Sequence, residues 1–210
     1  SIYEALEQAI ISSGGTIEFS SNGKFINDPD VVIGIFGEEP YAEMLGDLKD
    51  VSFVETDPKF LPLLEAINAQ NIPTVSIFLS GRPLEVNRQL NASDAFIAAW
   101  LPGSAVEGIA DVIFIKDNKI NYDFTGKLSY SWPRTKDQAV LNFTDSIYDP
   151  LFPFGYGLTY TSDLEVERIQ TNRSDSKLDL LNVFLGAASI PGKEFVVTET
   201  GPEFVLKDNF

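Results

Sequence analysis

Three glutamates lie close together in residues 37–47, GEEPYAEMLGD, which we call the acidic loop. Glu38 and Glu39 are adjacent, and Glu43 follows in the same segment. Closely spaced carboxylates can divide the roles of general acid and general base, provided that the acid holds a proton when the reaction starts. The chain contains no histidine and no cysteine, which excludes a Ser-His-Asp triad, a thiol nucleophile and a zinc site of the usual kind. Catalysis by this chain therefore depends on carboxylates, hydroxyls, lysine or arginine.

A buried strand is expected directly before the acidic loop. Residues 31–36, VVIGIF, form an unbroken apolar run rich in β-branched side chains, which is typical of a strand covered on both faces in a parallel sheet. From Gly37 onward, glycine, proline and acidic residues favour a shaped loop over an ordinary helix. Because open α/β sheets bind ligands at the carboxyl ends of their strands, we expect the acidic loop at the functional edge of the sheet.

Helices and short apolar strands alternate along the first part of the chain. Apolar residues at helical spacing predict helices over residues 2–13, 57–71 and 104–114, with a turn and a short helix in 80–93. Short apolar runs predict strands over 16–19, 31–36, 73–80 and 94–103. This alternation predicts an α/β fold with a mostly parallel, doubly wound sheet and helices on both faces.

The composition changes after residue 114. Residues 116–160 are rich in aromatic residues, glycine and proline, which predicts irregular but well-packed chain. Residues 161–177 are polar and predict a linker. Residues 178–210 hold short apolar stretches separated by turn residues, which predicts the start of a C-terminal β-rich module. We therefore expect a sandwich domain over 1–160, a linker and part of a second module.

The charge of the chain limits its partners. The net charge is -16, and phosphate binding needs clustered Lys and Arg, so nucleic acid and anionic membranes are poor partners. No apolar run reaches the roughly 18 residues of a membrane helix, and the first residues lack the pattern of a signal peptide. With 210 residues, of which 44% are hydrophobic, the chain can bury a core. We expect a neutral or cationic ligand, no metal and no cofactor.

Five segments of the chain together resemble one known family. They are GEEPYAEMLGD (37–47), SGRP (80–83), DAFIAAWLPGSAVEGIADVIF (94–114), FTGKLSYSWP (124–133) and YDPLFPFGYGLTY (148–160). In this order they resemble the second domain of glycoside hydrolase family three, the family of β-glucosidases and exo-acting β-glucan glucohydrolases. The resemblance covers about residues 1–160 and implies a six-stranded α/β sandwich, whose opening strand is not expected in this chain because Ser1 begins a predicted helix. Residues from about 178 resemble the start of an extra β domain of some bacterial members.

The resemblance also implies a mechanism. In this family a (β/α)8 barrel domain, which this chain lacks, carries the aspartate nucleophile, and in members of the exo-glucanase type the sandwich supplies the acid/base glutamate. Matching by position gives this role to Glu38, with Glu43 as the fallback. Retaining hydrolysis requires the two carboxyl groups to lie roughly 5 to 5.5 Å apart. The chain is therefore expected to hydrolyse terminal β-glucosyl residues of β-glucans or β-glucosides together with the barrel, and to be inactive alone.

Four other residues have weaker functional interpretations. Tyr41 and Glu39 are candidates for substrate binding in the acidic loop. Arg82 of the SGRP segment follows a predicted strand and can reach toward the cleft, but a structural ion pair is the simpler interpretation. Trp100 ends another predicted strand, and tryptophan commonly stacks on sugars, yet a core position explains AAWLPG more simply.

Two other classes of function remain open. A non-catalytic carbohydrate-binding or interaction module fits the acidic surface and the many aromatic residues. A nucleotide- or flavin-binding domain shares the predicted sheet topology, but residues 34–37, GIFG, do not match G-x-G-x-x-G, and the acidic loop repels phosphate. Since polysaccharides lie outside the cell, a role in polysaccharide degradation predicts a periplasmic or secreted protein.

Overall fold

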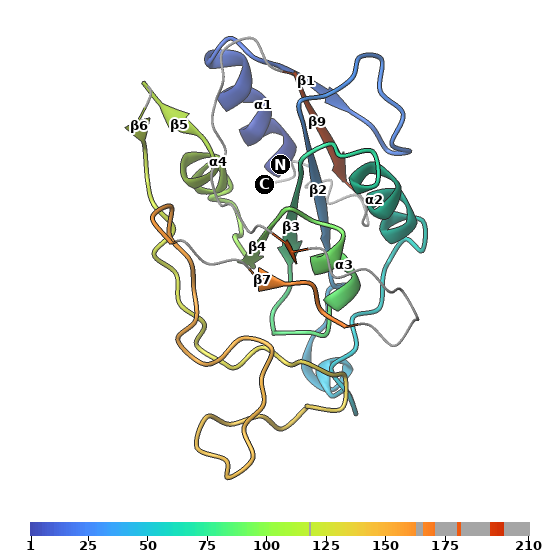
Figure 1. The fold of residues 1–210 in the computed structure, drawn as a ribbon, viewed down its shortest axis with the longest axis vertical. Helices are drawn as coiled ribbons and strands as arrows, with labels where there is room; N and C mark the ends of the chain where they lie inside the picture. The colour runs from blue at the N-terminus through green and yellow to red at the C-terminus, as the bar shows by residue number, and fades with distance from the viewer. Residues whose placement is uncertain (118, 163–165, 171–179, 182–193, 200–210) are drawn as a thin grey trace.

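The computed structural model describes residues 1–117, 119–162, 166–170, 180–181 and 194–199, and its main element is a five-stranded parallel sheet (Figure 1). The strands of this sheet are β1 (Thr16–Phe19), β2 (Val31–Gly37), β3 (Thr74–Leu79), β4 (Ala95–Trp100) and β9 (Glu194–Glu199), in the order β1-β9-β2-β3-β4. The helices are α1 (Ile2–Ser12), α2 (Phe60–Asn68), α3 (Asn87–Asn91) and α4 (Glu107–Ile113), together with the 3-10 helix η1 (Glu43–Gly46). Two short antiparallel pairs join β5 (Ile115–Lys116) to β6 (Lys119–Ile120) and β7 (Val166–Glu167) to β8 (Leu180–Leu181).

Helices cover both faces of the sheet (Figure 1). On one face, Ile33 and Ile35 of β2 pack with the apolar sides of α1 and α4. On the other face, Phe36 of β2 and Phe78 of β3 pack with α2 and α3. Successive side chains of a strand point to opposite faces, so a strand buried on both sides is apolar without interruption. The predicted α/β class, with a parallel sheet and helices on both faces, is confirmed.

The described sheet has five strands, and β9 comes from an unexpected part of the sequence. Residues 178–210 were expected to begin a separate β-rich module, yet β9 lies between β1 and β2 and is parallel to both. The apolar run in 194–199, EFVVTE, predicts a strand, but periodicity does not indicate which sheet a strand joins. The boundaries of the linker and of the second module stay predictions, because most of that range lies outside the described residues.

Residues 121–162 have no helix and no strand longer than a single bridge, and aromatic side chains hold them against the sheet. Trp132 is only 3% exposed, and its ring centroid lies 6.3 Å from those of Phe78 and Phe96. Trp132 also forms an isolated bridge with Phe152. Side chains, rather than a further strand, therefore join this segment to the sheet. In the described part of the chain, no helix combines the length and hydrophobicity needed to cross a membrane.

Candidate active site

The acidic loop leaves the sheet at the carboxyl end of β2, beside the end of β3. Gly37 pairs with Leu79 at the last position of the two strands, and the Glu38 N–H donates to the Leu79 carbonyl at 2.9 Å. The segment after β3 begins with Ser80 and Arg82, which places the SGRP segment next to the acidic loop. Two segments far apart in the sequence thus meet at the predicted edge of the sheet.

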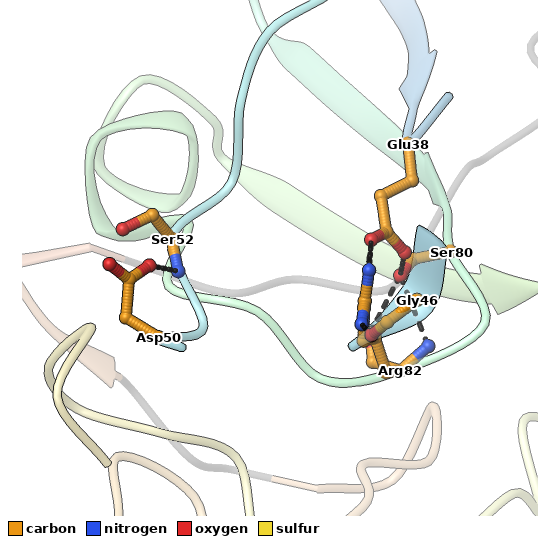
Figure 2. Close-up of polar contacts among 6 residues, drawn as sticks. All are labelled: Glu38, Gly46, Asp50, Ser52, Ser80 and Arg82. Carbon is orange, nitrogen blue, oxygen red and sulfur yellow. Dashed lines mark hydrogen bonds and ion pairs between the residues drawn. The ribbon is translucent and has the colours of Figure 1, made fainter. Parts of the chain in front are cut away.

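The Glu38 carboxylate is bound by both of these neighbours (Figure 2). Its Oε1 accepts hydrogen bonds from Arg82 Nε at 2.8 Å and Arg82 Nη2 at 2.6 Å, and its Oε2 accepts one from Ser80 Oγ at 2.7 Å. The side chains are mostly buried, with 12% of Glu38 and 23% of Arg82 exposed. The bonds from the guanidinium are charge-assisted, and together with the bond from the Ser80 hydroxyl they engage both carboxylate oxygens. Because both oxygens are engaged inside the protein, this arrangement argues against Glu38 as the group that reaches a leaving oxygen.

Arg82 connects the start of the acidic loop to its end. Its third guanidinium nitrogen, Nη1, donates to the Gly46 carbonyl at 2.6 Å, and Gly46 is the last residue of η1. The guanidinium carbon also lies 4.2 Å from the centroid of the Tyr41 ring, in a cation-π contact. One arginine therefore contacts the loop at Glu38, Tyr41 and Gly46. The structural ion pair considered for Arg82 is present, and its partner is the predicted catalytic residue.

Tyr41 packs inside the acidic loop against two glycines. A Cβ atom at Gly46 would lie 2.8 Å from Tyr41 Cδ2, and a Cβ atom at Gly81 would lie 2.7 Å from Tyr41 Oη. Any larger residue at either position would displace the ring. The described contacts of Tyr41 are thus contacts within the loop and with Arg82, and its proposed role in binding substrate stays a prediction.

Glu43 differs from Glu38 in its exposure, its contacts and its backbone conformation. It is exposed, and its backbone has φ 49°, in the left-handed region that L-residues other than Asn and Asp seldom adopt. Within the described part of the chain, the carboxylates of Glu43 and Glu39 make no hydrogen bond or ion pair. Such backbone conformations cluster at functional sites, where the surrounding structure enforces them. Glu43 is therefore an accessible carboxyl group on a conformationally constrained loop.

The chain beyond η1 is fixed by contacts of its own. The Val51 N–H donates to the Lys136 carbonyl at 2.9 Å, and the Glu85 N–H donates to the Val51 carbonyl at 2.8 Å. The Ser52 N–H donates to Asp50 Oδ1 at 3.0 Å (Figure 2). Hydrogen bonding by Ser52 lowers the pKa of Asp50. The acidic loop is thus held at its start, at Gly46 and again shortly after its end, while residues 39–45 are exposed between these points.

An apolar cavity of about 200 Å³ lies away from the acidic loop, between β4 and residues 124–158. Trp100 and Trp132 line it, and their ring centroids lie 6.0 Å apart. Trp100 is partly buried and packs in the core cluster around Phe36, in agreement with the simpler interpretation of this residue. Among the described residues, no three carboxylates, histidines or cysteines gather in a way that could hold a metal ion.

Sequence reasoning did not identify Ser80, Gly46 or Gly81 as parts of the site. Ser80 and Gly81 belong to SGRP, and Gly46 belongs to the acidic loop. The motifs therefore contained these residues, but the sequence assigned them no function. Their functions depend on side-chain contacts between segments, which no spacing within one segment reveals.

Comparisons of the sequence and of the structure with known proteins lead to the same family. The model of the "Glycosyl hydrolase family 3 C-terminal domain" matches residues 1–160. The structure of exo-1,3/1,4-beta-glucanase (ExoP) from a Pseudoalteromonas species is 50% identical, with a TM-score of 0.79 over 84% of this chain and 22% of that one.

Two relatives show the range of named activities. The periplasmic beta-glucosidase of Salmonella typhimurium is 28% identical over 155 residues, which are 63% of this chain and 19% of the relative. A beta-xylosidase of Formosa agariphila is 31% identical over 115 residues, which are 48% of this chain and 15% of the relative. The chain thus spans less than a quarter of the length of each of these proteins.

Proposed function

This chain belongs to glycosyl hydrolase family 3, and we propose that it is the acid/base-bearing part of a retaining, exo-acting β-glucosidase or β-glucan glucohydrolase. It works together with a (β/α)8 barrel domain that carries the nucleophile, and the pair hydrolyses terminal β-glucosyl residues. The exposure of residues 39–45 supports this division, because a sugar site buries most of its ligand and these residues are open to solvent in this chain. A second domain facing the loop would complete the site.

Glu43 is the residue that we propose as the general acid/base. The observation that carries this choice is the binding of Glu38 by Arg82 and Ser80, which engages both of its carboxylate oxygens inside the protein. Glu43 lies five positions later in the same loop, is exposed and has the strained backbone typical of functional residues. The sequence-based preference for Glu38 therefore gives way to the fallback, and Glu38 becomes a residue that shapes the loop.

The proposed reaction has two proton transfers at Glu43. In the first step, its carboxyl group gives a proton to the glycosidic oxygen while that oxygen leaves the anomeric carbon, and the barrel carboxylate bonds to the same carbon. In the second step, the Glu43 carboxylate takes a proton from water, and this water attacks the anomeric carbon and releases the barrel carboxylate. The two displacements together retain the configuration of the sugar.

The sugar and the location follow from the relatives and remain part of the proposal. A relative named exo-1,3/1,4-beta-glucanase supports β-glucan as the substrate, and the beta-xylosidase indicates that closely similar domains serve other sugars. We assign the choice of sugar to the barrel for this reason. The periplasmic relative supports a role in polysaccharide degradation outside the cytoplasm. Tyr41 and Glu39 of the acidic loop remain our candidates for contacts with the substrate.

Leaving-group dependence in the complete enzyme tests the proposal. We expect Glu43→Gln to lower kcat/KM for a β-1,3-linked glucose disaccharide by about 10²- to 10⁴-fold, because a sugar alkoxide leaves only with a proton. The same variant should nearly retain the glycosylation rate of 2,4-dinitrophenyl β-glucoside, whose leaving group needs no proton. Glu107→Gln, at an exposed position at the start of α4, is the matched control.

Three results would overturn parts of the proposal. If Glu38→Gln has the large leaving-group dependence and Glu43→Gln does not, the original assignment to Glu38 is restored. If Glu43→Gln lowers kcat/KM, which reports glycosylation, equally for both substrates, Glu43 is not a general acid. If neither variant affects hydrolysis, the chain acts as a non-catalytic carbohydrate-binding or interaction module.

A further inference from the structure

We propose that Arg82 is a positioning residue for proton transfer, which holds the acidic loop in the shape that presents Glu43 to the leaving oxygen. This inference rests on the proposed role of Glu43. Arg82 lies outside the acidic loop, at the end of β3, and its charge is directed at Glu38 rather than toward solvent. It therefore acts on the reaction through the loop and not through contact with the substrate.

The geometry of the guanidinium group ties the two ends of the loop together. Nε and Nη2 donate to Glu38 at the start of the loop, and Nη1 donates to the Gly46 carbonyl at the end of η1. Glu43 lies between these two anchor points. A planar guanidinium can satisfy both anchors at once, whereas a lysine ammonium is a point charge on a flexible stem and cannot replace the fork.

The Tyr41 ring fills the interior of the acidic loop. One side of its ring receives the Arg82 guanidinium at 4.2 Å, and its edge lies against the Cα positions of Gly46 and Gly81. Because glycine has no Cβ atom, Gly46 and Gly81 leave space for the Tyr41 ring that any other residue would fill. Arginine, tyrosine and glycine thus form one packed unit, in which movement of any member shifts the backbone on either side of Glu43.

The backbone of Glu43 shows why such a unit is needed. A glutamate with φ 49° is held in a conformation that a free loop would leave. In the structure, the Leu45 N–H donates to the Ala42 carbonyl at 3.2 Å and the Asp47 N–H donates to the Met44 carbonyl at 3.1 Å, which completes the tight turn. Arg82 fixes this turn through Gly46, so loss of Arg82 frees the Glu43 carboxyl to leave the position from which it transfers a proton.

Arg82→Lys in the complete enzyme tests the inference. Misplacement of a catalytic group by about 1 Å can cost about 100-fold, and we expect a loss of this order in kcat for the β-1,3-linked glucose disaccharide. The glycosylation rate with 2,4-dinitrophenyl β-glucoside, measured as kcat/KM, should stay near the wild-type value, because this leaving group needs no proton. The matched control is Arg88→Lys, whose arginine forms a surface ion pair with Glu65 at 2.9 Å.

A double variant separates positioning from general structural damage. If Arg82 acts through Glu43, then Arg82→Lys causes no further loss of disaccharide hydrolysis in the Glu43→Gln background. Equal losses on both substrates, additive losses in the double variant, or wild-type behaviour of Arg82→Lys would each overturn the inference. Failure of Glu43→Gln to show leaving-group dependence would instead overturn the proposed function, so the two failures are distinguishable.

A glycine variant keeps the test available if Arg82→Lys does not fold. Gly46→Ala places a methyl group 2.8 Å from the Tyr41 ring while every atom of the Arg82–Glu38 pair is kept. We expect the same selective loss on the disaccharide. Gly108→Ala in α4, where a Cβ atom meets nothing within 4 Å, is the control, and identical kinetics of the two glycine variants would contradict the inference.

Discussion

Gly37 and Leu79 approach each other so closely that the end of β2 has no room for a side chain. A Cβ atom at Gly37 would lie 2.5 Å from the Leu79 carbonyl oxygen and 2.8 Å from Leu79 Cβ. This close approach brings the residues that follow, Glu38 and Ser80, out of the sheet side by side. The position of the acidic loop therefore depends on the absence of a side chain at residue 37.

Gly37→Ala is expected to destabilise the chain by about 1–3 kcal/mol, because the added methyl group forces the two strands apart. Urea denaturation followed by tryptophan fluorescence measures this as a lower midpoint with an unchanged slope. Gly126→Ala is the control, since a Cβ atom there meets nothing within 4 Å. Equal midpoints for the two variants would show that the strand ends adjust without cost.

Tyr160 links the aromatic segment to the end of α4 and gives the fold a pH dependence at high pH. Its hydroxyl donates to the Val112 carbonyl and lies 3.3 Å from the Ile113 carbonyl. Burial, with a contribution from Asp123, raises the pKa of Tyr160 to about 12. The unfolded chain ionises near pH 10, so the stabilisation by the neutral phenol is complete below about pH 10 and is lost as the pH rises toward 12.

Tyr160→Phe should therefore lower the free energy of unfolding by about 1 kcal/mol at pH 7 through loss of the hydrogen bond. Between about pH 10 and 12 the difference between the two proteins should shrink, because only the wild type loses stability through residue 160. Urea midpoints across this range give the measurement. Tyr122→Phe, at an exposed tyrosine, serves as the control, and parallel curves for wild type and Tyr160→Phe would refute the prediction.

Glu55 gives a pH dependence in the acidic range. Burial raises the pKa of Glu55, although the Gln89 side chain donates a hydrogen bond to it at 2.7 Å. A carboxyl with a raised pKa in the folded state binds its proton more tightly there, so its contribution to stability is greatest at low pH. This contribution is lost as the pH rises above the value for an unfolded glutamate, about 4.3.

We expect Glu55→Gln to be as stable as the wild type or more stable at pH 7, with an advantage that disappears toward pH 4. The glutamine keeps an oxygen for the bond from Gln89 but carries no charge. Thermal midpoints at several pH values measure this difference. Asp137→Asn, at an exposed position, is the control. A wild type whose midpoint rises relative to that of Glu55→Gln as the pH increases would contradict the prediction.

Elements with a strong local pattern were predictable from the sequence. The apolar run 31–36 became β2, because a strand buried on both faces needs apolar residues at every position. The helix expected over 57–71 is shorter, Phe60–Asn68, since Asp57 begins a turn in which its Oδ1 accepts from the Lys59 N–H at 2.9 Å. Boundaries of this kind depend on individual hydrogen bonds rather than on periodicity.

Contacts between distant segments were not predictable. The sequence indicated both the acidic loop and SGRP, but the pairing of Glu38 with Arg82 depends on the register of β2 and β3. For the same reason, motif matching preferred Glu38 as the acid, although its oxygens are already occupied. The position of β9 between β1 and β2 was likewise not predictable, because an apolar run predicts a strand but not the sheet that the strand joins.

Azide rescue of Glu43→Ala in the complete enzyme tests the role of Glu43 most directly. Without a general base, water attacks the glycosyl-enzyme slowly, whereas azide is a nucleophile that needs no base. With 2,4-dinitrophenyl β-glucoside, we predict that azide accelerates Glu43→Ala and that the product is β-glucosyl azide, with no such rescue in Glu38→Ala. Rescue of Glu38→Ala alone, or glucose as the sole product from Glu43→Ala in azide, would contradict the assignment of Glu43 as the acid/base.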